Sequence, residues 1–185
     1  MKKLNVVFSV IFGLIVISCQ TSGSIVSSDG FKTSVDDVRG ITFITHKDME
    51  IGSFYNLRDS MTGERENISL YISGTDLIAS AEYQGSDWIF ISGIVFLDDS
   101  GNRLAIEYGS RTDSKVRTGA VGNVYVREHY GAILKSNDIS KLENILNSGK
   151  VYVAFLGKRT TEKMELKQKY KSAMIATIEK KATLN

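Results

Sequence analysis

Hydrophobic residues in this chain occur mainly in short runs, and the polar stretches between them carry residues that favour turns. The runs are enriched in β-branched and aromatic side chains, while Gly, Asp, Asn and Ser cluster between them. Both features are typical of β-strands and their connections. The pattern predicts strands at residues 41–46, 53–57, 68–72, 77–83, 88–97, 103–108, 121–129 and 151–158.

The run at 88–97 differs from the others because it is apolar at nearly every position. Such a run suits a central strand that is covered on both faces. Within it, Gly93 indicates a bulge or a close backbone contact. Residues 98–102 are all turn formers, so we expect a hairpin that leads into the strand at 103–108.

Two later segments have the periodicity of helices. The first is predicted at 138–147, with Ser136 or Asn137 as its N-cap and Gly149 at its C-terminal end. Its apolar face comprises Ile139, Leu142, Ile145 and Leu146. The second helix is predicted at 165–180, with an apolar stripe of Leu166, Tyr170, Ala173, Met174, Thr177 and Ile178. Lys167, Lys169 and Lys171 lie largely off that stripe.

Many short strands followed by two helices define the fold class. The sequence predicts a mainly β domain at residues 38–185. We expect an antiparallel β-sandwich, or a partly open barrel, with both helices in the C-terminal half of the chain. The periodicity does not decide between these two forms.

The N-terminus has the parts of an export signal. Lys2 and Lys3 precede an apolar run at 4–17. This run is shorter than the roughly 20 residues that a membrane-spanning helix needs, and its length is typical of a signal peptide. It ends in Val16-Ile17-Ser18-Cys19, which resembles the bacterial lipobox. The resemblance implies cleavage between Ser18 and Cys19 and attachment of diacylglycerol to the thiol of Cys19.

This reading divides the chain into a signal peptide at 1–18, a lipidated flexible tether at 19–37 and the globular domain. The tether is rich in Ser, Thr, Gly and Asp, although an ordered N-terminal strand is an alternative. Gln20 is not Asp, and by resemblance to the enterobacterial sorting rule it does not signal retention in the inner membrane. We therefore expect a lipid-anchored protein of the bacterial envelope, at the outer membrane, on its periplasmic face or at the cell surface.

The net charge of the chain argues against nucleic acid as a partner. Without Lys2 and Lys3 the chain has 21 basic and 21 acidic residues, and a neutral domain has no general attraction to nucleic acid. Residues 158–181 carry a net charge of +5. These charges could contact anionic lipid headgroups or an acidic partner, or they could form a solvated helix face.

A set of short motifs resembles a loosely defined group of bacterial exported β-sandwich proteins. The motifs are Asp87-Trp88, Gly101, Glu128, the helix at 139–146, Gly157-Lys158 and Ala173-Met174, and they cover about half of the chain. The export signal and the amino-acid usage also resemble those of spirochaete surface lipoproteins. Neither resemblance implies an activity or a catalytic residue.

Two stretches contain part of a ligand-binding motif. Gly157-Lys158-Arg159-Thr160 resembles the end of a phosphate-binding loop, but Tyr152 stands where the first Gly is required and Arg159 where Ser or Thr is required. Residues 98–102 offer oxygen ligands for Ca²⁺ without the spacing of a calcium-binding loop. A strand end and a hairpin turn, respectively, explain both stretches better.

The sequence contains no recognisable set of catalytic residues. With Cys19 lipidated, His46 and His129 are too few for a Cys/His zinc site. Glu128 and His129 are adjacent, so on a strand they point to opposite faces and cannot cooperate directly. The nucleophile motif Gly-x-Ser-x-Gly does not occur. We expect no catalytic residue, no metal and no cofactor, and hence not an enzyme.

Three functions are compatible with these features. The first is a non-enzymatic lipoprotein that binds an envelope or host protein, or has a structural role, through strand edges or the loop at 111–122. The second is a carrier of a small apolar ligand. Its pocket would be lined by Trp88, Phe90, Phe96, Tyr125 and Phe155. The third is an envelope hydrolase that acts through His129 or His46.

Overall fold

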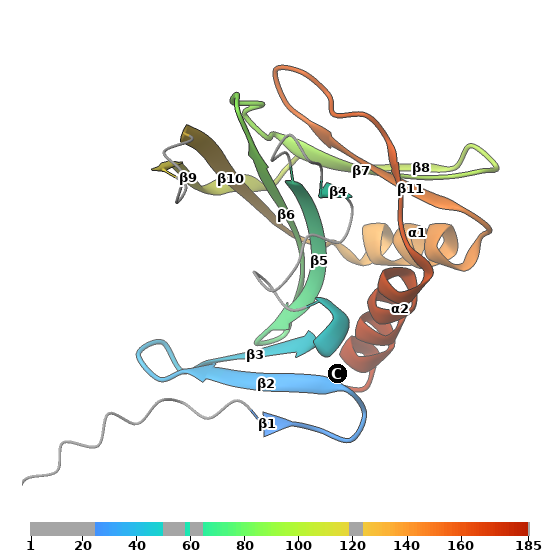
Figure 1. Ribbon diagram of the computed structural model, residues 1–185. Helices are drawn as coiled ribbons and strands as arrows, with labels where there is room; N and C mark the ends of the chain where they lie inside the picture. The colour runs from blue at the N-terminus through green and yellow to red at the C-terminus, as the bar shows by residue number, and fades with distance from the viewer. Residues whose placement is uncertain (1–24, 50–57, 60–64, 119–123, 185) are drawn as a thin grey trace, which may run out of the picture.

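Two antiparallel sheets and two helices make up the fold (Figure 1). The structure is a computed structural model that describes residues 25–49, 58–59, 65–118 and 124–184. Residues 16–19 of the predicted lipobox, the signal peptide and the predicted strand at 53–57 lie outside the described residues. The fold class predicted from the sequence is confirmed, and neither sheet closes on itself within the described part of the chain.

The larger sheet has eight strands in the order β1-β2-β3-β5-β6-β10-β9, with β4 paired to β5. These strands are β1 (Ile25–Val26), β2 (Phe31–Asp36), β3 (Ile41–His46), β4 (Arg58–Asp59), β5 (Arg65–Ser73), β6 (Asp76–Gly85), β9 (Ser110–Thr118) and β10 (Val124–Ile133). The smaller sheet has the order β12-β11-β7-β8. Its strands are β7 (Gly93–Asp98), β8 (Arg103–Ile106), β11 (Val151–Leu156) and β12 (Met164–Glu165).

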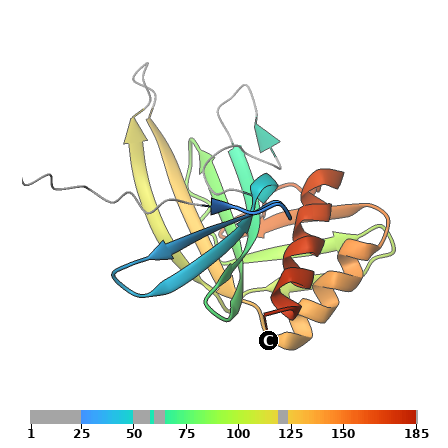
Figure 2. The ribbon, with the colours of Figure 1, turned by 90° about the horizontal axis from the view of Figure 1, so that it is seen from below.

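Both helices lie on one side of the molecule, next to the space between the sheets (Figures 1 and 2). Helix α1 (Ser136–Asn147) contacts β7 and β8, while α2 (Gln168–Ala182) contacts α1, β3, β5 and the short 3-10 helix η1 (Lys47–Met49). Apolar side chains from both sheets and both helices form one core. Its fully buried members include Ile68, Phe96, Leu142, Phe155 and Met174.

The N-terminal strands lie where the sequence predicted a tether. β1 and β2 fall within residues 25–36 and pair with each other, and β2 also pairs with β3. The aromatic ring of Phe31 is buried and stands perpendicular to the ring of His46, 5.1 Å away. This burial and the β2–β3 ladder explain why a stretch of mostly small polar residues joins the sheet, as the alternative reading allowed.

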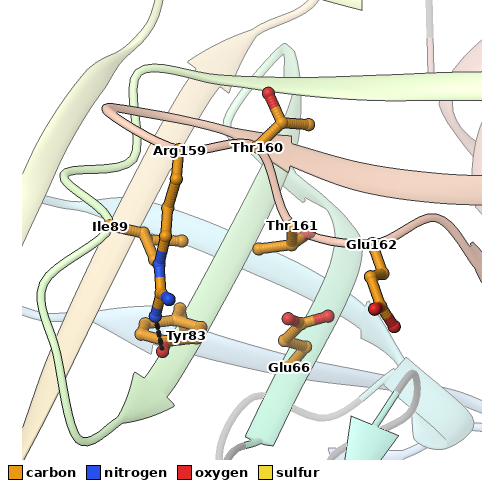
Figure 3. Close-up of a pocket in the computed structure, with 7 residues that line it drawn as sticks. All are labelled: Glu66, Tyr83, Ile89, Arg159, Thr160, Thr161 and Glu162. Atoms are coloured by element: carbon orange, nitrogen blue, oxygen red, sulfur yellow. Dashed lines mark hydrogen bonds between the residues drawn. The ribbon is translucent and has the colours of Figure 1, made fainter.

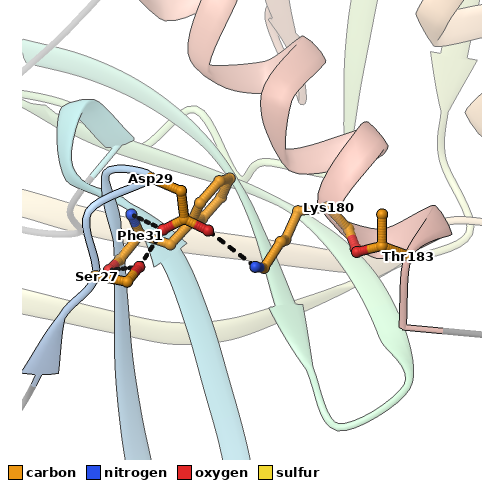
Figure 4. A network of polar contacts seen from close by, with 5 residues as sticks. All are labelled: Ser27, Asp29, Phe31, Lys180 and Thr183. Carbon is orange, nitrogen blue, oxygen red and sulfur yellow. Dashed lines mark hydrogen bonds and ion pairs between the residues drawn. The ribbon is translucent and has the colours of Figure 1, made fainter.

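A polar contact joins the β1–β2 connection to the C-terminal helix (Figure 4). The Nζ of Lys180 donates to Oδ2 of Asp29 at 2.9 Å. Asp29 also accepts hydrogen bonds from the hydroxyl of Ser27 and, at 3.3 Å, from the backbone N–H of Phe31. These hydrogen bonds, foremost that from Ser27 and then that from Lys180, lower the pKa of Asp29 to about 2.

β9 is another strand that the sequence missed, because a loop was predicted at 111–122. β9 is an edge strand that pairs only with β10 among the described strands, and most of its described side chains are exposed. Without burial there is no alternation of apolar and polar residues to detect. The backbone hydrogen bonds to β10 hold it instead.

The buried strand predicted at 88–97 is confirmed in part. β7 lies between β11 and β8 and is buried on both faces, as the apolar run indicates. It begins at Gly93 rather than at Trp88. A Cβ on Gly93 would lie 2.9 Å from the carbonyl oxygen of Ile106, which confirms the predicted close backbone contact.

Helix α1 begins before its predicted start. Its N-cap is Lys135, and no side chain caps it, so the predicted caps Ser136 and Asn137 are wrong: both residues already lie inside the helix. Gly149 has a different role from the predicted cap. A Cβ there would lie 2.5 Å from Oδ2 of Asp99, so the glycine permits the approach of that carboxylate.

Helix α2 begins at Gln168 rather than at 165, so Leu166 precedes it, but all six residues of the predicted apolar stripe are buried. Lys171, predicted to lie largely off the stripe, is buried as well. Its Nζ donates to the carbonyl oxygen of Ser148 and, at 2.8 Å, to that of Gly149. Lys171 therefore carries a positive charge to the C-terminal end of α1, where the helix dipole favours it.

Candidate functional site

Glu128 on β10 organises the segment before β7. Its side chain is fully buried, yet it accepts three backbone hydrogen bonds from one short segment. Oε1 accepts from Ile89 at 2.7 Å and from Phe90 at 3.1 Å, and Oε2 accepts from Ile91 at 2.9 Å. Because these N–H groups point to one carboxylate, residues 89–91 cannot continue the ladder of β7.

Phe90 adopts a backbone conformation that is rare for a bulky residue. Its φ is 54°, and it is the sole non-glycine residue with positive φ in the described part of the chain. The left-handed region disfavours an L-residue by about 1–2 kcal/mol. Hydrogen bonds to an ionised carboxylate contribute about 1.5–3 kcal/mol each, so the Glu128 contacts are strong enough to hold Phe90 there. Strain of this kind is concentrated at functional sites.

The chain after β11 holds the same segment from the other side. The backbone N–H of Lys158 donates to the carbonyl of Ile89 at 2.8 Å, and that of Ser92 donates to Leu156 at 2.8 Å. A Cβ on Gly157 would lie 2.1 Å from the oxygen of Ile89, so this position requires glycine. Gly157-Lys158 is therefore a strand end that packs on residues 89–92, as the sequence indicated in preference to a phosphate-binding loop.

An open groove of about 400 Å³ lies beside this segment. Its lining residues are Phe90, Ile91, Ser92, Glu107, Gly109, Arg111, Tyr130 and Lys158. The Nζ of Lys158 lies 4.1 Å from the centre of the Phe90 ring, and the guanidinium of Arg111 lies 5.3 Å from it. The ring of Trp88 stacks on Phe90 with centres 5.9 Å apart. Phe90 thus stands among two cations and a second aromatic ring.

The opposite wall of the groove is formed where the chain crosses from β8 to β9. The Tyr130 hydroxyl donates to the carbonyl of Ile106 at 3.0 Å and accepts from the N–H of Gly109 at 2.7 Å. Burial raises the pKa of Tyr130. A Cβ on Gly109 would lie 2.4 Å from the carbonyl of Gly131, so the connection packs closely on β10. These contacts make the wall rigid.

A smaller cavity, of about 200 Å³, lies on the other side of the segment (Figure 3). Its lining residues are Glu66, Tyr83, Ile89, Arg159, Thr160, Thr161 and Glu162. Arg159 reaches across to the hydroxyl of Tyr83 at 3.3 Å. Thr161 closes the loop after β11, since its Oγ1 accepts from the N–H of Phe155 at 3.0 Å. Ile89 therefore lines the smaller cavity, whereas Phe90 lines the groove.

The two histidines do not share a site. His46 lies on β3 and His129 on β10, with β5 and β6 between them in the sheet, which separates the strands by about 14 Å. Nδ1 of His46 accepts from the N–H of Asp48 at 3.2 Å. His129 lies 3.9 Å from the carboxylate of Glu82. Desolvation lowers the pKa of both imidazoles.

Glu128 and His129 have separate surroundings, as their adjacent positions on a strand predict. Glu128 is buried and accepts its three hydrogen bonds, whereas His129 is half-buried beside Glu82. The hydrolase alternative required polar groups that converge on His129 or His46. Neither histidine lines the groove or the smaller cavity.

The acidic turn after β7 is explained by its own hydrogen bonds. Oδ1 of Asp98 accepts from the N–H groups of Ser100 at 3.0 Å and Asn102 at 2.8 Å, while Oδ2 accepts from the Asn102 amide at 2.7 Å. These contacts, led by the Asn102 side chain, lower the pKa of Asp98. In the part of the chain that the structure describes, no three His, Cys, Asp or Glu side chains cluster as a metal site would require.

The five aromatic residues proposed for an apolar pocket do not come together. Phe96 and Phe155 are buried in the core, and Tyr125 is half-buried on β10 without lining either space. Only Trp88 and Phe90 stack on each other, and Phe90 alone lines the groove. The arrangement does not favour an apolar carrier.

Comparisons with known proteins add no relative: no family model, no curated protein and no solved structure matches the chain. Across the described residues, neither helix has the combined length and hydropathy needed to cross a bilayer.

Proposed function

We propose that this chain is a lipid-anchored, non-enzymatic binding protein of the bacterial envelope, and that the groove around Phe90 contacts its partner protein. The anchor is the diacylglycerol on Cys19 that the lipobox resemblance implies. The groove provides a rigid wall, an aromatic ring and two cations, which suit recognition rather than bond cleavage. The partner is an envelope or host protein.

The observation that carries this proposal is the conformation of Phe90. A φ of 54° is unfavourable for Phe, and Asn or Gly would adopt it more easily. The ring nevertheless lies in an open groove rather than in the core, so its burial does not explain why Phe occupies this position. Aromatic and Arg side chains are enriched at the energetically important centres of protein interfaces.

The position of the first strand is compatible with anchoring at Cys19. β1 begins at Ile25, and the six intervening peptide units could span at most about 20 Å. A lipid on Cys19 would therefore keep the domain close to the bilayer.

The first test replaces Cys19 with Ala. We expect the variant to take up no labelled fatty acid and to leave the detergent phase, and unchanged labelling or partitioning would overturn the anchor.

Site-specific photo-crosslinking tests the groove. A photoreactive amino acid replaces Ser92 in the groove, and in a matched control it replaces Ser100, which is exposed in the turn after β7. In intact cells we expect one discrete adduct from position 92 and none from position 100. The substitution Phe90→Asn should abolish that adduct.

Two outcomes would contradict the proposal. Adducts of equal yield from positions 92 and 100 would indicate random collisions. An adduct at position 92 that persists in the Phe90→Asn variant would show that the ring makes no contribution to binding.

A further inference from the structure

The cations beside Phe90 have hydrogen-bond donors that face no acceptor. Arg111 carries five N–H donors and Lys158 three. Within the described residues, neither side chain donates a hydrogen bond, and the one carboxylate within 4 Å of Arg111 is that of Glu128, at 3.9 Å. The Glu128 oxygens are already occupied by three backbone N–H groups. A ligand with several acceptor oxygens would complete this arrangement.

The shape of the groove places that ligand on the Phe90 ring. Lys158 and Arg111 both lie within 6 Å of the ring centre, so an anion that contacts both cations would lie next to the ring. The neighbouring Trp88 extends the aromatic surface. Flat or apolar atoms next to the anion could stack there.

Glu107 limits the charge that the ligand can bring. Its side chain is exposed and lines the same groove. A doubly charged phosphate would be repelled by Glu107 more strongly than a singly charged carboxylate. The planar guanidinium of Arg111 also matches a carboxylate in bidentate geometry.

We propose that the groove binds a carboxylate side chain, Asp or Glu, from an acidic segment of the partner protein, held by Arg111 and Lys158 against Phe90. This assignment rests on the proposed function and specifies the chemistry of its partner. Of the charged side chains that line the groove, Lys158 and Arg111 are cations and Glu107 is the one anion. The further carboxylate near Arg111, that of Glu128, accepts three backbone N–H groups.

The chain contains its own reporter for this test. Trp88 is the one tryptophan in the sequence, and it stacks on Phe90. Its fluorescence can therefore follow binding to the full chain in zwitterionic detergent micelles at physiological salt. The probe is acetyl-Gly-Glu-Phe-Glu-Gly-amide, and the comparison ligands are the same peptide with Gln in place of Glu and inorganic phosphate.

We expect a saturable change in Trp88 emission with the Glu peptide and weaker binding of both comparison ligands. Lys158→Gln and Arg111→Gln should each weaken binding about tenfold, because each removes charge-assisted hydrogen bonds. The matched control is Lys163→Gln. Lys163 also lies over an aromatic ring, 4.9 Å from that of Tyr152, but outside the groove, and its replacement should leave binding unchanged.

Three results would overturn the assignment: no saturable change with the Glu peptide, equal or tighter binding of the Gln peptide or of phosphate, and equal loss in the Lys163→Gln control. The photo-adduct at position 92 separates this failure from failure of the proposed function. If the adduct requires Phe90 but survives Lys158→Gln and Arg111→Gln, the groove binds a partner whose contact is not acidic.

Discussion

The buried carboxylate of Glu128 accepts a hydrogen bond from the backbone N–H of Phe90 at 3.1 Å, across 38 positions of sequence. With the neighbouring bonds from Ile89 and Ile91, this contact joins the larger sheet to the start of the smaller one. One acidic side chain therefore positions the Phe90 ring in the groove and ends the ladder of β7.

Replacement of Glu128 by Gln should destabilise the fold. The amide offers one acceptor oxygen and places an NH₂ group opposite a backbone donor, so at least one buried N–H loses its partner. We expect a loss of about 3 kcal/mol in the free energy of unfolding, measured by urea denaturation.

Glu107→Gln is the matched control for that substitution. Glu107 is an exposed carboxylate at the same groove, so its replacement should change stability by less than about 0.5 kcal/mol. A Glu128→Gln variant as stable as this control would show that the carboxylate does not hold residues 89–91.

The two histidines should make the free energy of unfolding depend on pH. Desolvation lowers the pKa of His46 and His129 below the ordinary value of 6.5, so the unfolded chain takes up protons before the folded one does. The free energy of unfolding should therefore carry no penalty from these two groups above pH 6.5, and it should decrease as the pH falls below that value.

Urea midpoints between pH 7.5 and 5 measure this loss. The double variant His46→Gln, His129→Gln should show a smaller decline across that range than the unsubstituted protein. A decline of equal size would assign the pH dependence to other groups.

Lys171 should contribute to stability although it carries a charge in a buried position. Lys171→Ala removes the donors to the carbonyls of Ser148 and Gly149 at the end of α1. We expect a loss of about 2 kcal/mol in the free energy of unfolding. Lys169→Ala, an exposed lysine on the same helix, should have an effect below about 0.5 kcal/mol. Equal effects of the two substitutions would contradict the capping role.

The core elements follow from sequence patterns that burial imposes. β3 matches the predicted strand at 41–46, and the stripe from Leu166 to Ile178 is buried as expected. β9 and β2 were missed because backbone pairing and one buried aromatic residue, Phe31, hold them rather than a repeated apolar pattern.

The site around Glu128 and Phe90 could be predicted from the sequence only in part. Val126, Glu128, Tyr130 and Ala132 occupy alternate positions of β10 and are all buried. A single Glu in an otherwise apolar face is the signal that could have marked Glu128 as a buried acceptor. Its partners could not be predicted, because the bonds to Ile89, Phe90 and Ile91 depend on how the two sheets pack.

The comparison of Phe90→Asn with Phe90→Ala tests the central claim most directly, because both variants lack the ring and differ in how well they tolerate positive φ. Asn adopts the left-handed conformation more readily than Ala. If Glu128 holds position 90 in that conformation, the Asn variant will have a free energy of unfolding about 1 kcal/mol higher than the Ala variant. Equal stability, or a more stable Ala variant, would show that the segment is not held there and would contradict the account.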